Sequence, residues 1–451
     1  MTPGAARKNS SFHAARWLAH ANATLWAVGN GLATSTLITT LAGEFGARGV
    51  AVSLILAAPT VVGLLRQAAP RLIDAWGSRK QLCIAMYVLS ALVLMLLPVI
   101  AAPGVLPSAR WSLAALVTLW CGYQVLEYFG TVALWSWLGD MAEPATRGRF
   151  LGAREGWLSA GRLVGMLASG LFTFHWPDWF SRETLWQAYA LCSATGALIM
   201  LCAVVPLLLM PALEAGPSLQ SARPRLSWRM IFFAPLADRR FNRLVAYGCW
   251  LGAVNGLLGA SQFLYGRRVL GLSLLVMLAM RAQTEVGQTI ISWPIGRLVD
   301  RIGNKRVMIA SQLLVALAMY FYLTTAPEQW WWIFGASTLF IAYAGLNVGI
   351  PNLLLKLAPD EQRSAYIASH YAWAGLAYGL GSLGGGVLFD IAQSRHWTLY
   401  FGEWRLDHFA LFFASGMLLR ALGAVWIAVI PERRGEEEFT TETRRARRRQ
   451  K

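Results

Sequence analysis

Charged residues at helical spacing inside an apolar stretch are the strongest candidates for chemistry. In the stretch 272–298, four polar residues follow one another at i, i+4, i+7 and i+11, which places them on one face of a helix. They are Arg281, Glu285, Gln288 and Ser292. Because Arg281 and Glu285 lie one turn apart, they can pair with each other. Two interpretations stay open: the pair stabilises helix packing, or it binds a solute or a coupling ion.

A second polar face lies in the stretch 112–138, where Gln124 and Glu127 share one side of the predicted helix. A lone carboxyl group at membrane depth suits a proton carrier, because it can be charged or neutral. Alternatively, Arg162 neutralises Glu127. The guanidinium groups of Arg162 and Arg281 suit an organic anion. The aromatic content and Glu127 equally suit an amphipathic or cationic solute.

Neutral polar residues in three other stretches add to these faces. They are Asn30, Asn255 and Asn347. Each alone is weak, because polar side chains in lipid often bond within their own helix, but together they are typical of a hydrated central cavity. Arg420 lies in the middle of the last apolar stretch, and its favoured interpretation is pairing with a neighbouring helix.

Metal, redox and nucleotide chemistry have no support in the sequence. The five cysteines show no CxxC spacing, and no pair of histidines has the spacing of metal ligands. No lysine follows a glycine, so the chain has no Gly-Lys phosphate-binding loop. We therefore predict no catalytic residue, metal or cofactor, and we exclude an ATP-driven pump.

Apolar stretches of about twenty residues, long enough to cross a bilayer as helices, must position these side chains. The chain has 451 residues, of which 56% are hydrophobic and 14% charged. We predict an all-α, polytopic membrane protein with twelve transmembrane helices in two six-helix halves. The predicted spans are 22–43, 50–72, 81–101, 112–138, 150–173, 186–210, 244–265, 272–298, 306–325, 331–355, 366–389 and 408–430. The spans 150–173 and 366–389 are rich in glycine, which suits either static packing or sliding of helices.

The distribution of basic residues gives the topology. The net charge is +17, and most Lys and Arg fall on the loops that share a side with the N-terminus, so both termini are predicted to be cytoplasmic. No nucleic-acid partner is expected. The predicted domains are an N-terminal segment 1–21, a bundle 22–210, a linker 211–243 with an interfacial segment, a bundle 244–430 and a basic tail 431–451.

Two loop patterns occur once in each half of the chain. One begins at Arg71 and recurs at Arg297, with Arg, Leu, Asp and Gly in matching positions. The other joins the fourth span to the fifth and the tenth to the eleventh, and contains Arg147 in the first copy and Arg363 in the second. Since both pairs of loops follow equivalent spans in the two halves of the chain, they indicate an internal repeat. The glycine of the first pattern is expected to end a helix with a positive φ.

The second copy of the first pattern resembles the loop signature of the major facilitator superfamily: Gly296-Arg297-Leu298-Val299-Asp300-Arg301-Ile302-Gly303-Asn304-Lys305-Arg306. The first copy departs from it at Pro70 and Ala75. The resemblance implies that the signature aspartates help to close the cytoplasmic side. The gate-loop residues carried over in this way are Asp74, Gly77, Arg79, Asp300, Arg301, Gly303, Lys305, Arg147 and Arg363.

The expected function is therefore secondary active transport of a small organic solute by alternating access, with protons as the coupling ion. The expected substrate and coupling residues are Glu127, Gln124, Arg162, Arg281, Glu285, Gln288, Asn30, Asn255 and Asn347. We expect a multi-pass monomer in the bilayer of the cell membrane. The alternatives are a non-transporting sensor or escort protein of the same fold, or an integral-membrane transferase.

Overall fold

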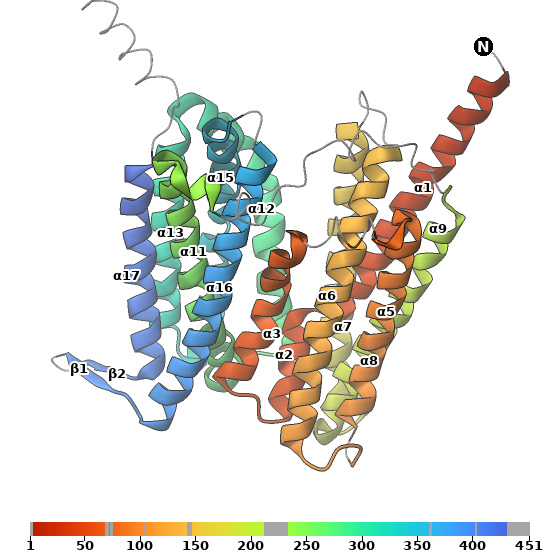
Figure 1. Ribbon diagram of the computed structural model, residues 1–451. Helices are drawn as coiled ribbons and strands as arrows, with labels where there is room; N and C mark the ends of the chain where they lie inside the picture. Colours follow the sequence, from red (N-terminus) through yellow and green to blue (C-terminus); the bar gives the residue numbers. More distant parts are fainter. Residues whose placement is uncertain are drawn as a thin grey trace, which may run out of the picture. The chain divides into compact units, whose positions relative to one another are not determined.

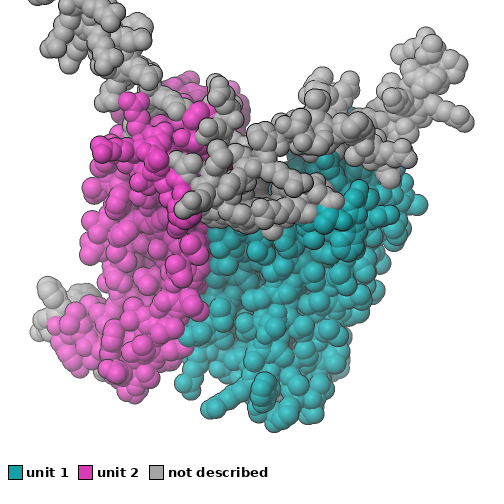
Figure 2. Space-filling view, in the orientation of Figure 1, with its two compact units in different colours: residues 1–223, 266–282 teal, residues 224–265, 283–451 magenta. Residues whose placement is uncertain are grey.

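The chain folds into helices at every predicted span. The structure is a computed structural model that describes residues 3–67, 72, 75–102, 104–141, 147–211, 233–359, 363–401 and 404–430. Two compact units are present (Figure 2): unit 1 comprises 1–223 and 266–282, and unit 2 comprises 224–265 and 283–451. The predicted division placed 266–282 in the second bundle, whereas its residues group with unit 1. The domain boundaries stay a prediction.

Unit 1 contains the helices of the first six predicted spans (Figure 1). They are α1 (Pro3–Leu32), α2 (Ser35–Glu44), α3 (Gly49–Val61), η1 (Val62–Gln67), α5 (Arg79–Ala101), α6 (Ala109–Met141), α7 (Arg147–Trp179), η2 (Arg182–Thr184), α8 (Leu185–Cys202) and α9 (Val204–Leu209). The first predicted span is broken between α1 and α2, where the Thr34 hydroxyl accepts from the Leu37 N–H at 3.2 Å and so caps α2.

Unit 2 contains most of the remaining elements. They are η3 (Ala234–Ala237), α11 (Arg239–Leu264), the π-turn η4 (Tyr265–Val269), α12 (Leu274–Ile302), α13 (Asn304–Thr324), η5 (Pro327–Ile333), α14 (Phe334–Phe340), α15 (Tyr343–Leu357), α16 (Arg363–Ser394), β1 (Leu399–Phe401), β2 (Trp404–Leu406) and α17 (His408–Val429). Gly266 to Val269 of η4 and the first residues of α12 belong to unit 1. Strands β1 and β2 form an antiparallel hairpin with Tyr400 opposite Arg405, which the all-α prediction did not include.

Glycines bring one helix pair in each unit into backbone contact. In unit 1, a Cβ at Gly31 of α1 would overlap the carbonyl of Arg162 and lie 2.9 Å from the Cα of Gly165 on α7. In unit 2, a Cβ at Gly256 of α11 would overlap the carbonyl of Tyr378 on α16. These glycines therefore serve close packing within each unit.

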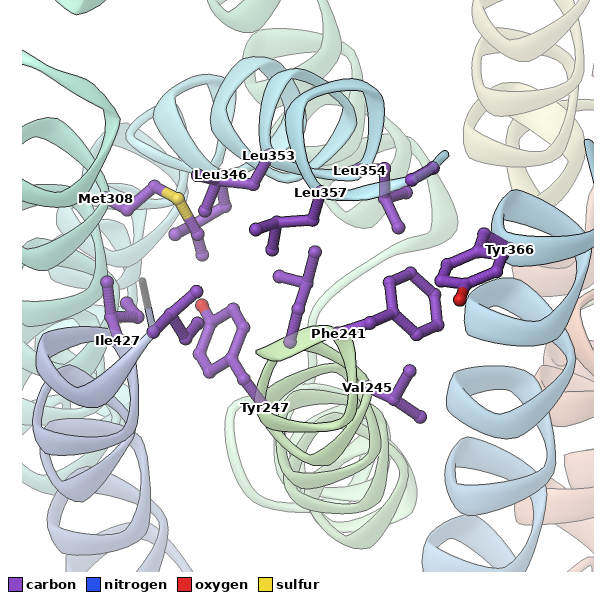
Figure 3. Packing of buried hydrophobic residues seen from close by; sticks show 13 residues of the cluster. Phe241, Val245, Tyr247, Met308, Leu346, Leu353, Leu354, Leu357, Tyr366 and Ile427 are labelled. Atoms are coloured by element: carbon purple, nitrogen blue, oxygen red, sulfur yellow. The ribbon is translucent and has the colours of Figure 1, made fainter. Parts of the chain in front are cut away.

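The apolar core of unit 2 is formed by one buried cluster. Figure 3 shows Phe241 of α11 facing Tyr366 of α16, and Tyr247 of α11 on the side of Ile427 of α17, with Leu353 and Leu357 of α15 in the same cluster. Residues of α13, α16 and α17 complete the cluster. Burial of these side chains, at about 25 cal/mol per Å² of apolar area, fixes α11 against its neighbours and so fixes the polar residues that α11 carries.

Candidate functional site

Glu127 ends a chain of hydroxyl groups in unit 1. The Tyr87 hydroxyl lies 3.0 Å from Thr131 Oγ1, and Thr131 Oγ1 donates to Glu127 Oε1 at 3.1 Å. Because the only Thr131 proton is used on the carboxylate, Tyr87 must donate to Thr131. The Trp26 ring stacks on the Tyr87 ring, with 3.8 Å between the ring centroids. The carboxyl group thus accepts from Thr131 of α6, which in turn is bonded to Tyr87 of α5.

Three more predicted residues lie close to this chain. Asn30 Nδ2 donates to the Tyr123 hydroxyl at 3.1 Å, and Gln124 is buried. Arg162 is half-buried, its Nε has no hydrogen-bond partner, and its charge acts on both Glu127 and Tyr123. No ion pair joins Arg162 to Glu127 in the described part of unit 1. The pairing interpretation is therefore not supported as a direct contact.

Unit 2 holds a second polar group on α11, α12, α14 and α15. The Tyr343 hydroxyl donates to Asn255 Oδ1 at 2.7 Å. Asn347 Nδ2 donates to Gln288 Oε1 at 3.2 Å, and Gln288 Nε2 donates to the Phe340 carbonyl at 3.2 Å. That carbonyl is available because α14 ends at Phe340, before α15 begins. Three predicted residues, one from each of the seventh, eighth and tenth spans, thus lie in one unit.

The charged pair of the eighth span is divided between the two units. Arg281 is exposed, belongs to unit 1 and donates through Nη1 to Ser35 Oγ at 3.4 Å, a long contact. Glu285 is half-buried and belongs to unit 2. Their predicted role in binding or coupling stays a prediction.

The repeated loops have the predicted turn. Gly77 has φ +76° and Gly303 has φ +91°, so each loop turns at its glycine. Arg79 begins α5, Lys305 lies in the first turn of α13, and Asp300 and Arg301 are exposed near the end of α12. Arg147 and Arg363 begin α7 and α16, but their side chains, like Asp74 as a whole, lie outside the described residues. The gating role of these residues stays a prediction.

Sequence reasoning missed several partners of these sites. Tyr87 and Gln312 lie in spans without internal charge, and each is a polar residue in an otherwise apolar stretch. A more specific signal is the short repeat Asn30-Gly31-Leu32 and Asn255-Gly256-Leu257. In each copy the asparagine bonds a tyrosine and the glycine contacts a neighbouring helix.

Comparison with known proteins identifies the fold. Residues 279–450 match the family model of the Major Facilitator Superfamily. The match covers less than half of the chain, so the chain is similar to this superfamily over its second part. Eight helical segments of the described residues are long and apolar enough to cross a membrane, in agreement with a multi-pass protein. Helices α6 and α12 are not among the eight, in keeping with the polar residues that they carry.

Solved structures of transporters share the fold of this chain over nearly its whole length. A D-xylose-proton symporter is 15% identical, with a TM-score of 0.68 over 94% of this chain and 99% of its own. A point mutant of the nucleoside transporter NupG is 13% identical, with a TM-score of 0.67 over 92% of this chain and 99% of its own. An inward-open xylose transporter XylE from E. coli is 15% identical, with a TM-score of 0.63 over 94% and 98%. Among curated proteins, none matches the chain. The chain thus has the fold of these transporters.

Proposed function

We propose that this protein is a secondary transporter that uses the proton gradient to move a small polar organic solute, with the proton carried in unit 1 and the solute bound mainly in unit 2. The observation that carries the proposal is the contrast between the two polar groups. Unit 1 holds the carboxyl group of Glu127 at the end of a directed hydroxyl chain. Unit 2 offers neutral amides and a hydroxyl on Asn255, Gln288, Tyr343 and Asn347.

The proton assignment follows from what the neighbours of Glu127 can do. Thr131 donates to the carboxylate and Tyr87 donates to Thr131, and because both are neutral they stabilise the carboxylate without fixing its charge. Arg162 acts from a distance and does not form an ion pair with Glu127. Such a carboxyl group can bind and release a proton as its surroundings change. Its protonation can thus be coupled to the alternating access of the transporter.

The solute assignment follows from the neutral amides. Amide and hydroxyl groups bind solutes through directed hydrogen bonds, which suits hydroxyl and carbonyl groups. A D-xylose-proton symporter and a nucleoside transporter share the fold, and both kinds of solute carry such groups. We therefore propose a sugar-like or nucleoside-like solute. We also propose that the protein is a monomer of the cell membrane with both termini in the cytoplasm.

Flux into proteoliposomes tests the proposal. Purified protein is reconstituted, and uptake of [³H]uridine and D-[¹⁴C]xylose is measured with and without an inward proton gradient. We expect accumulation of at least one solute, which a protonophore abolishes. Uptake that equilibrates without accumulating would refute the proton coupling. A protein that binds solutes in a thermal-shift screen but gives no flux would instead be a sensor or an escort.

A further inference from the structure

Arg420 is a buried cation in the middle of a membrane-spanning helix. It lies in α17 with 3% of its surface exposed. Burying a guanidinium group is costly unless its donors are satisfied. No carboxylate pairs with it in the described part of the chain, and its Nε has no hydrogen-bond partner. Its retention at this depth therefore calls for a specific role.

The backbone of Arg420 is fixed from one side by α13 and α11. Gln312 Nε2 donates to the Arg420 carbonyl at 2.7 Å, and the Tyr247 hydroxyl donates to Gln312 Oε1 at 2.9 Å. Gly423 makes room for the amide, since a Cβ there would lie 2.9 Å from Gln312 Nε2. Gln312 and Tyr247 are almost fully buried. The helix that carries Arg420 is thus locked at this depth.

On the other side, the guanidinium group sets the direction of a hydrogen-bond chain. Arg420 Nη1 donates to the Tyr343 hydroxyl at 3.1 Å, and its Cζ lies 5.3 Å from the centre of the Phe340 ring. An arginine can only donate. The Tyr343 oxygen therefore accepts from Arg420, and its single proton goes to Asn255 Oδ1, 2.7 Å away.

This chain determines the orientation of the Asn255 amide. If the amide were reversed, Tyr343 would face donors on both sides and its own proton would lose its partner, at a cost of about 1–3 kcal/mol for an unsatisfied group. The carbonyl of Asn255 therefore faces Tyr343, and both amide N–H bonds lie on the other side. Among the described residues, these N–H groups have no partner.

We propose that Arg420 is a positioning residue that acts through Tyr343: it fixes Asn255 as a hydrogen-bond donor, so that the solute group bound there must be an acceptor, such as a carbonyl or carboxylate oxygen. This inference rests on the proposed function, because it assumes that Asn255 contacts the solute. It assigns the chemical class of one end of the solute, which the neutral amides alone leave open.

Transport kinetics test the role. The Arg420→Met variant is expected to raise the KM for [³H]uridine, whose base carries two carbonyl oxygens, about tenfold while the saturated rate stays within about twofold. The Arg420→Lys variant keeps a donor and is expected to restore the KM to within about threefold of the wild-type value. Ser415→Ala, on the same helix, is the matched control and should change neither. A KM equal to the wild-type value in Arg420→Met would overturn the proposal. If Arg420→Met does not fold, Tyr343→Phe is measured in its place.

A ligand-free measurement separates this inference from the proposed function. Thermal unfolding of detergent-purified protein gives Tm values for Arg420→Met, Asn255→Ala and the double variant. We expect the two losses in Tm to be non-additive when Tyr343 is present and additive in a Tyr343→Phe background. If the losses in Tm are additive although Tyr343 is present, Arg420 does not act on Asn255 through Tyr343. If the wild type takes up neither uridine nor D-xylose, the proposed solute class fails. The Tm values of the single and double variants then test by themselves whether Arg420 acts on Asn255 through Tyr343.

Discussion

The first and seventh spans each carry an asparagine followed by glycine and leucine, and the two asparagines take opposite roles in their hydrogen bonds to tyrosine. In unit 1, Asn30 donates to Tyr123, so its carbonyl is left for other partners. In unit 2, Asn255 accepts from Tyr343, so its N–H groups are left. The nearby charge is a carboxyl group in unit 1, at Glu127, and a guanidinium group in unit 2, at Arg420. A repeated Asn–Tyr pair can therefore present either an acceptor or a donor.

The packing beside each asparagine does not differ in this way. Gly31 and Gly256 each follow the asparagine directly, and each allows backbone contact with the next helix, α7 or α16. The repeat thus preserves the helix contact while the polar network around it has diverged. This is the pattern expected if the packing serves the fold of both units and the polar groups serve different tasks.

Removing the carboxyl group should give the largest functional effect. We expect Glu127→Gln to abolish solute accumulation driven by a proton gradient, because no group at this position can then exchange a proton. Solute counterflow without a gradient should persist. Accumulation and counterflow are measured in the same proteoliposomes. Glu155→Gln, an exposed position on α7, is the matched control, and equal loss in both variants would contradict the coupling role of Glu127.

The shared packing can be broken in both units with one methyl group. Gly31→Ala and Gly256→Ala should each destabilise the protein by about 3 kcal/mol, since the added carbon meets a backbone carbonyl that cannot move alone. The free energy of unfolding is measured by titration with SDS in mixed micelles. Gly122→Ala is the control, because a Cβ at this helical position has open space. A stable Gly256→Ala protein beside an unstable Gly31→Ala protein would show that the two contacts are not equivalent.

The two tyrosines should respond unequally to loss of the hydroxyl group. Tyr123→Phe removes one hydrogen bond to a half-buried amide and should cost about 1 kcal/mol. Tyr343→Phe also leaves the buried Arg420 guanidinium without its acceptor, so it should cost about 3 kcal/mol. The same SDS titration measures both. Equal losses in the free energy of unfolding would mean that Arg420 finds another acceptor in Tyr343→Phe. Arg420 would then not explain why the two asparagines have opposite roles.

The fold was largely predictable from the sequence, and the polar networks were not. Runs of about twenty apolar residues fix the positions of helices, and all twelve predicted spans contain helix within the described residues. The glycine turns at Gly77 and Gly303 followed from the loop repeat, and their positive φ angles confirm that prediction. Both predictions depend on local properties of the chain, which a sequence displays directly.

The partners of Glu127 and Asn255 depend on contacts between helices that are distant in sequence. Glu127, Gln124 and Asn30 were chosen as polar residues inside apolar stretches, but Tyr87 was missed because a single tyrosine in an apolar helix usually faces lipid headgroups or core. The direction of the hydrogen bond between Tyr343 and Asn255 is still harder to predict from the sequence, because it depends on Arg420, which lies 165 positions from Asn255. Whether the chosen residues act in transport stays a prediction.

The smallest effect is expected at the loop glycines Gly77 and Gly303, which both have a positive φ. Gly77→Ala and Gly303→Ala should each cost about 1 kcal/mol, because a side chain at positive φ crowds the carbonyl, and at Gly77 the added carbon meets no neighbouring atom that would raise this cost. Gly43→Ala, within α2 and also in open space, should change the free energy of unfolding by less than about 0.5 kcal/mol. Equal losses in the free energy of unfolding at Gly77 and Gly303 would show that both halves keep the same turn although their polar groups differ. A cost at Gly303 alone would restrict the shared loop conformation to the half that retains the full superfamily signature.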